Sequence, residues 1–308
     1  MFFKDLIKKL ILPKPFNTGY LERPDGHKIY YHEYGTKGAQ PALYFHGGPG
    51  GFSHPRHALP FPQKRSHVIL FDQRGGGKSE PMFCLKNNTT GHIIDDAKAL
   101  LDHLGVKKKV VLRGNSYGST LCLLFAQKFP KLVKSMFLSC LFLARKEDYI
   151  EWMDIMANLY PDSRAQINAL VPKGKSYFAA FSDMVNSADP KVSTKAAQLH
   201  AGYEWSLGNV LPFVPPATPD IMAYAKISLY FEKNHYFIAE NQIIQNARKI
   251  KDIPTYLIHN RLDLVCAVKQ AFDLHAALPK SKLTVVPELG HGGPLLHQAV
   301  KEVIEKVF

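Results

Sequence analysis

Short apolar runs and stretches with helical periodicity alternate along most of the chain. The apolar runs lie at residues 41–45, 68–71, 109–112, 135–138, 255–259 and 282–287. Runs of this kind are typical of buried strands, and the stretches between them carry apolar residues at the spacing of one helix face, for example at 95–104 and 119–129. Strands that alternate with helices form a parallel sheet that is covered on both faces. The pattern therefore predicts an α/β fold, which a hairpin over residues 18–34 precedes.

The alternation stops near Leu141 and returns after Ile253-Pro254. In between, aromatic residues and scattered prolines accompany helical periodicity, and no clear strand is found. Helices are predicted over residues 195–205 and 222–238, with a proline-rich connector at 208–220 before the second. A helical block inserted into a split sheet is expected to cover the carboxyl ends of the strands, where α/β proteins bind their ligands.

This interruption divides the chain into two predicted domains. Residues 1–140 and 248–308 together form a core with a mostly parallel sheet and helices on both faces. Residues 141–247 form a helical cap inserted into that core. A chain of 308 residues is long enough for this arrangement.

The first twelve residues have an amphipathic pattern, with apolar side chains on one helical face and lysines opposite. The stretch is too short and too interrupted for a transmembrane helix, and it lacks the apolar core and cleavage site of a signal peptide. Two interpretations stay open: a weak membrane-surface helix, or a short helix that packs on the body or frays. The second is favoured, and no stable membrane insertion is predicted.

Composition limits the classes of function. The chain has 39 basic and 26 acidic residues and a formal net charge of +13. Because the lysines are scattered, a solvated basic surface is favoured over binding of nucleic acid. The four cysteines are widely spaced without a C-x-x-C motif, which argues against a zinc site and a disulfide framework. Such cysteine usage fits a reducing compartment, so a cytoplasmic protein is predicted.

The strongest chemical signal lies between the strand at 109–112 and the helix at 119–129. It reads Gly114-Asn115-Ser116-Tyr117-Gly118, a G-x-S-x-G pattern between strand and helix. A serine on such a sharp turn projects its hydroxyl above the sheet, and the glycines avoid clashes with neighbouring backbone. The helix N-terminus that follows favours a developing oxyanion. Five residues could also form an ordinary turn, so partners for Ser116 must be found.

Two partners follow the strands at 255–259 and 282–287. Asp263 comes after the first strand and His291 after the second, so both should reach the sheet edge where Ser116 lies. The order serine, acid, histidine is the order that such hydrolases use. We expect His291 to accept the serine proton and Asp263 to orient the imidazole ring. Asp252 and Glu288 are competing acids, although they are less well placed.

A glycine-rich loop, His46 to Gly51, follows the strand at 41–45, and a second one, Asp72 to Ser79, follows the strand at 68–71. The first can bring backbone N–H groups close to a ligand, although a flexible turn has the same composition. A phosphate-binding loop would need G-x-x-x-x-G-K-[ST], which is absent. The chain also lacks an H-E-x-x-H metal motif and a dinucleotide fingerprint in the proper context, so neither a metal nor a cofactor is predicted.

These residues together resemble the prolyl aminopeptidase, or proline iminopeptidase, family. The matching segments are residues 18–35, HGGPGG (46–51), LFDQRGGGKSEP (70–81), NTT (88–90), residues 114–130, NRLDLVC (260–266) and GHGG (290–293). The resemblance implies the α/β-hydrolase fold with a cap, and an oxyanion hole made by the backbone N–H groups of Gly48 and Tyr117. It runs from about residue 13 to the C-terminus.

The resemblance also implies how the substrate is bound. In this family, acidic residues of the cap hold the free amino end of the substrate. The glutamate of the W-x-x-W-E motif is Glu204 here, while His200 and Tyr203 replace the tryptophans. The glutamate of E-N-H-Y-F corresponds to Glu232, which lies one residue further from the HYF segment. On a helix, one residue is about 100° of rotation, so its role depends on a local adjustment of the turn.

Aromatic residues are expected to form the wall of a pocket for a proline ring. Phe142 and Phe237 are the candidates, and Trp152 fits either this wall or the core of the cap. Ser139 stands where the family has an arginine. A structural alternative exists for Glu204, which could simply lie on a solvated helix face.

The predicted function is therefore a serine aminopeptidase that releases N-terminal residues, proline by preference, from peptides through an acyl-enzyme. Its partner would be a peptide or small amide with a free N-terminus, and the oligomeric state is left open. A related amidase or an esterase would keep Ser116, Asp263 and His291 without needing the cap carboxylates. A non-catalytic relative usually loses one member of the triad, and this chain keeps all three.

Overall fold

The structure of the protein is a computed structural model that describes residues 12–207 and 213–308. The side chains of residues 150–154 and 156, Trp152 among them, also lie outside what it describes. The N-terminal segment with the amphipathic pattern is almost wholly outside the described residues, so its interpretation stays a prediction.

The predicted α/β fold is confirmed by an eight-stranded sheet, in which the strands follow the order β1-β2-β4-β3-β5-β6-β7-β8. The first two strands form the expected hairpin, and β2 also pairs antiparallel with β4, whereas the remaining pairs are parallel. The bounds are β1 Asn17–Glu22, β2 Lys28–Gly35, β3 Gln40–Phe45, β4 Ser66–Phe71, β5 Val110–Asn115, β6 Val133–Ser139, β7 Thr255–Leu262 and β8 Ser281–Leu289.

The central strands are buried on both faces, which explains their continuous apolar runs. In β3, Leu43 and Phe45 belong to the core on one face, and Ala42 and Tyr44 belong to the core on the other. This alternation follows from the two-residue period of a strand. A sheet with both faces covered keeps its carboxyl edge as the open place for a site.

Helices cover both faces of this sheet. The first face carries α1 (Thr90–His103), α2 (Tyr117–Lys128) and α9 (Lys269–Ala277), whose buried residues belong to the larger core. The second face carries α10 (Pro294–Val307) and the short 3₁₀ helix η1 (Pro55–Ala58). Helix α1 begins earlier than the periodicity predicts, because the side chain of Thr89 accepts a hydrogen bond from the N–H of His92 and caps it there.

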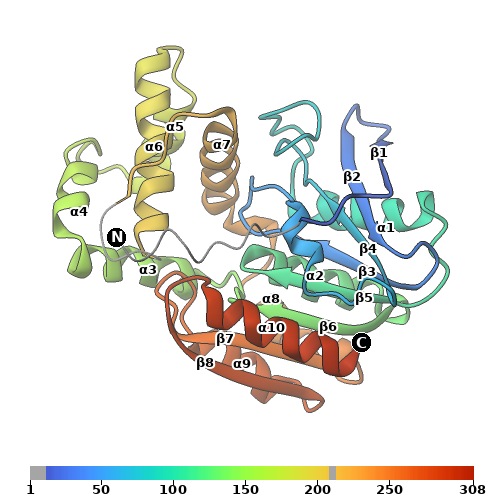
Figure 1. Cartoon of the computed structure of the whole chain (residues 1–308). Helices are drawn as coiled ribbons and strands as arrows, with labels where there is room; N and C mark the ends of the chain where they lie inside the picture. The colour runs from blue at the N-terminus through green and yellow to red at the C-terminus, as the bar shows by residue number, and fades with distance from the viewer. Residues whose placement is uncertain (1–11, 208–212) are drawn as a thin grey trace, which may run out of the picture.

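A helical segment connects β6 to β7, at the place where the predicted cap begins and ends. Its elements are α3 (Lys146–Leu159), α4 (Pro161–Asn168), α5 (Tyr177–Val185), α6 (Pro190–Ser206), α7 (Pro219–Lys233), η3 (His235–Phe237), α8 (Gln242–Gln245) and η4 (Ala247–Ile250). Figure 1 shows α5, α6 and α7 standing together, away from the sheet. The division of the chain into core and cap domains stays a prediction.

The second predicted cap helix differs from expectation at both ends. The proline-rich connector was expected to extend to residue 220, but α7 begins at Pro219, where Thr218 caps it with its side chain. The helix ends at Lys233 rather than at Ile238, because His235, Tyr236 and Phe237 all have positive φ angles of 49°, 53° and 55°.

Within the described residues, no helix combines the length and apolar character needed to cross a membrane.

Candidate active site

Ser116 lies on a turn between β5 and α2 that is too tight for side chains at its glycines. Its own backbone has φ 56° and ψ −130°, which is a strained conformation for a residue other than glycine. A Cβ atom at Gly114 would lie 2.2 Å from the carbonyl oxygen of Gly118, and one at Gly118 would lie 2.1 Å from that of Phe45. The G-x-S-x-G pattern is therefore required by the packing of strand against helix.

Backbone hydrogen bonds hold this strained turn. The N–H of Ser116 donates to the carbonyl of Ser139 over 3.0 Å. The carbonyl of Ser116 accepts from both the N–H of Ser119 (2.8 Å) and its hydroxyl (2.6 Å). Because its backbone is fixed in this way, Ser116 has little freedom to move, and its side chain faces a cavity.

His291 and Asp263 form a hydrogen-bonded pair at the ends of β8 and β7. Nδ1 of His291 lies 2.8 and 3.0 Å from the two carboxylate oxygens of Asp263. The carboxylate also accepts from the N–H groups of Val265 and Cys266 at 3.0 and 2.9 Å. Burial alone would raise the pKa of Asp263, but His291, His259 and these N–H donors lower it.

The competing acids are engaged elsewhere. Asp252 lies on the surface and pairs with Lys280 at 3.1 Å. Glu288 accepts from the N–H groups of Leu295 and Leu296, in the first turn of α10. The arrangement therefore pairs Asp263 rather than either of these acids with His291.

The loop that carries His291 is held from the neighbouring strand. The side-chain amide of Asn260, fully buried in β7, donates to the carbonyls of Gly290 (2.8 Å) and Gly292 (2.6 Å). These two carbonyls flank His291, so Asn260 fixes the loop on both sides of the imidazole. Sequence reasoning missed this role, although Asn260 opens the NRLD segment that contains Asp263.

The pKa of His291 results from opposing influences. Burial lowers it, but the negative charge of Asp263, its hydrogen bond to Nδ1 and the charge of Glu204 outweigh burial and raise the pKa above its usual value of 6.5. The influence of Glu204 is notable because this residue comes from α6, in the helical segment, whereas His291 comes from the sheet. The two parts of the chain therefore share one electrostatic environment.

Hydrogen bonds join the two glycine-rich loops beside Ser116. The ring of His46 donates from Nδ1 to the carbonyl of Gly47 (2.7 Å) and accepts at Nε2 from the N–H of Gln73 (3.0 Å). The side chain of Gln73 returns a hydrogen bond to the carbonyl of His46 (2.8 Å). A Cβ at Gly47 would lie 3.3 Å from Cβ of Ser116, so the loop backbone lies directly against the serine.

The second loop is anchored in turn by buried charges. Arg74 makes two hydrogen bonds to the carboxylate of Asp96 on α1, at 2.5 and 2.8 Å, and one to Asp25 at 2.5 Å. Arg23 adds a contact of 2.9 Å to Asp96. Arg74 is only 2% exposed, so its charge depends on these partners.

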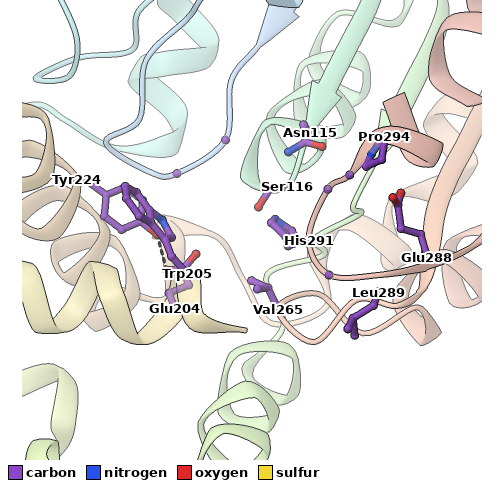
Figure 2. A pocket seen from close by; sticks show the side chains of 15 residues that line it. Asn115, Ser116, Glu204, Trp205, Tyr224, Val265, Glu288, Leu289, His291 and Pro294 are labelled. Carbon is purple, nitrogen blue, oxygen red and sulfur yellow. Dashed lines mark hydrogen bonds between the residues drawn. The ribbon is translucent and has the colours of Figure 1, made fainter. Parts of the chain in front are cut away.

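A cavity of about 580 Å³ opens above Ser116. Figure 2 shows Ser116 and His291 at its centre, with Glu204, Trp205 and Tyr224 on the opposite wall. Gly48 lines the same cavity. The predicted oxyanion residue Tyr117 is fully buried, and its hydroxyl lies 2.9 Å from Oγ1 of Thr90, so only its backbone can serve the cavity.

A second, smaller cavity of about 20 Å³ adjoins Ser116 and is lined by both predicted cap glutamates. One oxygen of Glu204 and one of Glu232 lie within 4.8 Å of each other. Tyr224 donates its hydroxyl to Glu204, as the dashed line in Figure 2 marks. Burial raises the pKa of both carboxyl groups, that of Glu232 strongly, and the charge of Glu204 adds to the effect on Glu232.

The chain is similar to known proteins over most of its length. A family model of the α/β-hydrolase fold matches residues 41–176. The chain is 33% identical over 289 residues to a proline iminopeptidase of Arabidopsis thaliana, which covers 90% of this chain and 76% of that protein. It is 31% identical over 310 residues to a proline iminopeptidase of Neisseria gonorrhoeae, covering 96% and 98%.

The chain belongs to the proline iminopeptidase family of α/β-hydrolases. It is therefore a hydrolase, and the predicted fold class is confirmed. Among solved structures, an α/β-hydrolase enzyme from a Medee basin deep-sea metagenome library superposes with a TM-score of 0.62 at 17% identity, covering 94% of this chain and 96% of that one. A thermophilic esterase from Thermogutta terrifontis gives 0.59 at 19% identity, covering 94% and 99%. Such low identities concern the fold alone.

One residue that the family resemblance implied for the pocket is elsewhere. Phe237 is not among the described residues that line either cavity beside Ser116. Its ring packs on Tyr230 and Phe231, each with centroids 5.2 Å apart, and it lines a separate cavity next to α1 and α2. Tyr236 lines the small cavity in its place, together with Phe142. The structure therefore does not bring Phe237 to the cavities beside Ser116, and a role for this residue in substrate binding stays a prediction.

The left-handed turn at residues 235–237 explains two differences from the family pattern. Tyr236 rather than Phe237 lines the small cavity, and one extra residue separates Glu232 from the HYF segment. The extra residue between Glu232 and the HYF segment is taken up where the backbone leaves the helix with positive φ. Glu232 itself lies in the last turn of α7, buried, and faces the small cavity. Two further lining residues, Tyr224 and Cys266, were not predicted, and Cys266 lies in the same NRLDLVC segment as Asp263.

Proposed function

We propose that this protein is a serine aminopeptidase that hydrolyses the bond after the N-terminal residue of a peptide or small amide, with a preference for proline. Ser116 is the nucleophile, His291 the general base and Asp263 the residue that holds His291. The hydrogen bonds between Nδ1 of His291 and Asp263 support these roles, because they leave Nε2 free to accept the serine proton.

The reaction proceeds in two steps. The hydroxyl oxygen of Ser116 attacks the carbonyl carbon of the first residue while its proton passes to His291. The backbone N–H groups of Gly48 and Tyr117 stabilise the negative oxygen of the tetrahedral intermediate. His291 then gives the proton to the leaving amine, which leaves an acyl-enzyme. Water activated by His291 hydrolyses this ester and restores Ser116.

The observation that carries the proposal is the pair of cap carboxylates on the cavity of Ser116. A free N-terminus carries a positive charge, and Glu204 and Glu232 offer it two acceptors, of which Glu232 is buried and Glu204 half-buried. The small cavity has room for one water-sized group, such as an ammonium or imine nitrogen. The large cavity, which Glu204 also lines, takes the rest of the residue. Binding at the amino end therefore fixes cleavage after the first residue.

Other features support a preference for proline, the role of the cap and a cytoplasmic location. Phe142 and Tyr236, with ring centroids 5.0 Å apart, line the small cavity beside the glutamates, so their aromatic surface would meet the part of a proline ring next to its nitrogen. Residues 141–247 would act as the cap that supplies these groups to the core. The widely spaced cysteines favour the cytoplasm as the compartment.

The test compares charged and neutral substrates in a Glu204→Gln variant at pH 8. A charge-assisted hydrogen bond is worth about 1.5–3 kcal/mol, so kcat/KM for prolyl naphthylamide should fall roughly ten- to a hundredfold. An N-acetylated amide or a neutral aryl ester should change little. Glu240→Gln, which removes an exposed carboxylate from the same helical segment, is the matched control and should leave both rates unchanged.

Equal loss for amine and ester substrates in Glu204→Gln would make Glu204 a structural residue and favour an esterase.

Ser116→Ala serves as the check on the nucleophile itself. It should abolish labelling by a fluorophosphonate and lower turnover by at least about a thousandfold, with residual activity from the oxyanion hole. Near-normal turnover in this variant would contradict the assignment of Ser116.

A further inference from the structure

We propose that His200, Glu204 and Glu232 form a binding site for a divalent transition-metal ion such as Zn²⁺. One ring nitrogen of His200 and one carboxylate oxygen from each glutamate lie within 4.8 Å of one another. Because zinc bonds to nitrogen and oxygen are about 2.0–2.2 Å long, a single ion that contacts all three would draw these atoms to within about 4.4 Å of one another.

The site is built on two helices that pack side by side, α6 and α7 (Figure 1). His200 and Glu204 are four residues apart on α6, and Ser228 and Glu232 are four residues apart on α7. Residues at this spacing lie above one another on one helix face. His200 faces Ser228 at 2.8 Å, so the pair of glutamates lies one turn further along the same interface.

Glu232 is the observation that points to a missing ligand. This residue is 4% exposed, and its Oε2 atom is buried without a hydrogen-bond partner among the described residues. A buried carboxylate oxygen without a partner is unfavourable, and a cation next to it removes that cost. The small cavity that both glutamates line has room for one water-sized occupant, and His200, which does not line this cavity, approaches the glutamates from the interface of α6 and α7.

The surroundings of His200 favour the neutral imidazole that a metal ligand requires. Its Nδ1 lies 2.8 Å from the hydroxyl of Tyr177, which can accept a hydrogen bond from a protonated Nδ1, and in that tautomer Nε2 is unprotonated. Nε2 now contacts the hydroxyl of Ser228. That hydroxyl also lies 3.4 Å from the carbonyl of Ala225, so it keeps a partner when Nε2 turns to a metal. Full burial of the imidazole keeps it neutral, as metal binding requires.

The donor set selects the class of metal. One imidazole and two carboxylates suit Zn²⁺ or Co²⁺, with water in a fourth position. Mg²⁺ and Ca²⁺ prefer oxygen ligands alone, so they should bind weakly. The metal would occupy the position that the proposed function gives to the substrate amine. It should therefore inhibit hydrolysis of amine substrates, and this consequence rests on the proposed function, whereas the binding itself does not.

Binding is tested by titrating the whole protein with Co²⁺ and following its visible absorption, together with calorimetry of Zn²⁺. His200→Phe removes the nitrogen ligand and should weaken binding at least tenfold. His200→Gln, which can keep hydrogen bonds to Tyr177 and Ser228, covers the case in which the phenylalanine variant does not fold. Cys140→Ser is the matched control, because Cys140, Asp263 and His291 form a second cluster of possible ligands. It should leave the affinity unchanged.

Inhibition supplies an independent measurement. Zn²⁺ at this site should slow prolyl naphthylamide far more than a neutral aryl ester, and His200→Gln should remove that difference, whereas Mg²⁺ should slow neither substrate. Unchanged Co²⁺ affinity in both His200 variants, or loss of binding in Cys140→Ser, would overturn the proposal. If Glu204 fails to distinguish amine from ester but Co²⁺ still needs His200, the proposed function fails and the metal site stands.

Discussion

At the scale of single residues, the site combines a fixed serine with a histidine whose proton affinity depends on two carboxylates. Ser116 is held by backbone bonds in a conformation that few residues adopt, so its position does not depend on its side chain. His291, by contrast, is tuned through its charge. Asp263 contacts it directly, and Glu204 acts through space from α6. The chemistry of this site is therefore sensitive to pH in a direction that can be predicted.

A base must be neutral to accept a proton, so activity should fall as the pH drops through the pKa of His291. Because that pKa is raised, the acid limb of kcat/KM should have its midpoint above 6.5. A neutral aryl ester is the appropriate substrate, since it does not titrate. Glu204→Gln removes one of the charges that raise the pKa, so its acid limb should move to lower pH.

The measurement is a set of kcat/KM values between pH 5 and 9 for both proteins. Glu240→Gln, which removes an exposed carboxylate, should leave the limb in place. A wild-type midpoint below 6.5 would contradict the raised pKa of His291, and an identical limb in Glu204→Gln would show that the charge of Glu204 does not reach His291.

At the scale of elements, the loops beside Ser116 depend on charges buried under them. Arg74 follows β4, Asp96 lies on α1, and Asp25 lies in the turn between β1 and β2. Three separate elements thus meet at one guanidinium. The loop that contains Arg74 in turn supports the one that contains His46 and lies against the serine.

Asp96→Asn should be strongly destabilising. The substitution leaves Arg74 buried with part of its charge uncompensated, and breaking a buried pair costs about 3–5 kcal/mol. Urea unfolding measures the effect. Asp102→Asn on the same helix is the control, because its partner Lys98 and the carboxylate itself are exposed, and such pairs contribute at most about 0.5 kcal/mol. Similar losses in the two variants would contradict the role of the buried network.

The elements also show what could be read from the sequence. Ser116, Asp263 and His291 each follow directly after a strand, so the topology of a parallel sheet was enough to bring them to one edge. The core packing of β3 and β5 followed from their apolar runs in the same way. Phe237 could not be predicted, because the residues that line the cavity depend on three consecutive positive φ angles that periodicity does not reveal. Asn260 was missed because its two hydrogen bonds link β7 to a loop that is 30 or 32 residues away in the sequence.

At the scale of the whole molecule, charge and buried histidines act in the same direction. The chain carries a formal net charge of +13, so added protons increase repulsion within the folded state. His32 and His200 are packed in the interior, and His57 is half-buried. Burial, the largest influence on each, lowers their pKa values to about 4, 2 and 3. These three histidines therefore stay neutral in the folded protein at pH values just below 6.5, where the same histidines bind protons in the unfolded chain.

This difference predicts a steep loss of stability in acid. Between about pH 6 and pH 4 the unfolded state binds more protons at these histidines than the folded state. By linkage, each such histidine lowers the free energy of unfolding by about 1.4 kcal/mol for every pH unit below 6.5. Glu232, whose folded pKa is raised above 4.5, opposes this trend in part, whereas the raised pKa of His291 contributes only above pH 6.5. A comparison of variants that differ at one histidine isolates its share.

His57 offers the cleanest comparison, because its ring packs against Tyr44 with centroids 4.5 Å apart and an interplanar angle of 35°, and a phenylalanine can keep that contact. Besides burial, the charges of Arg113 and Arg56 hold its pKa down. His57→Phe removes the titration, so its stability should decline less steeply below pH 6.5, by about 1 kcal/mol per pH unit. Urea unfolding at pH 7.5, 6.5 and 5.5 gives the slopes, and any constant offset from altered packing cancels. Parallel slopes in the two proteins would mean that His57 takes up its proton without unfolding, and that burial between η1 and the sheet does not keep it neutral.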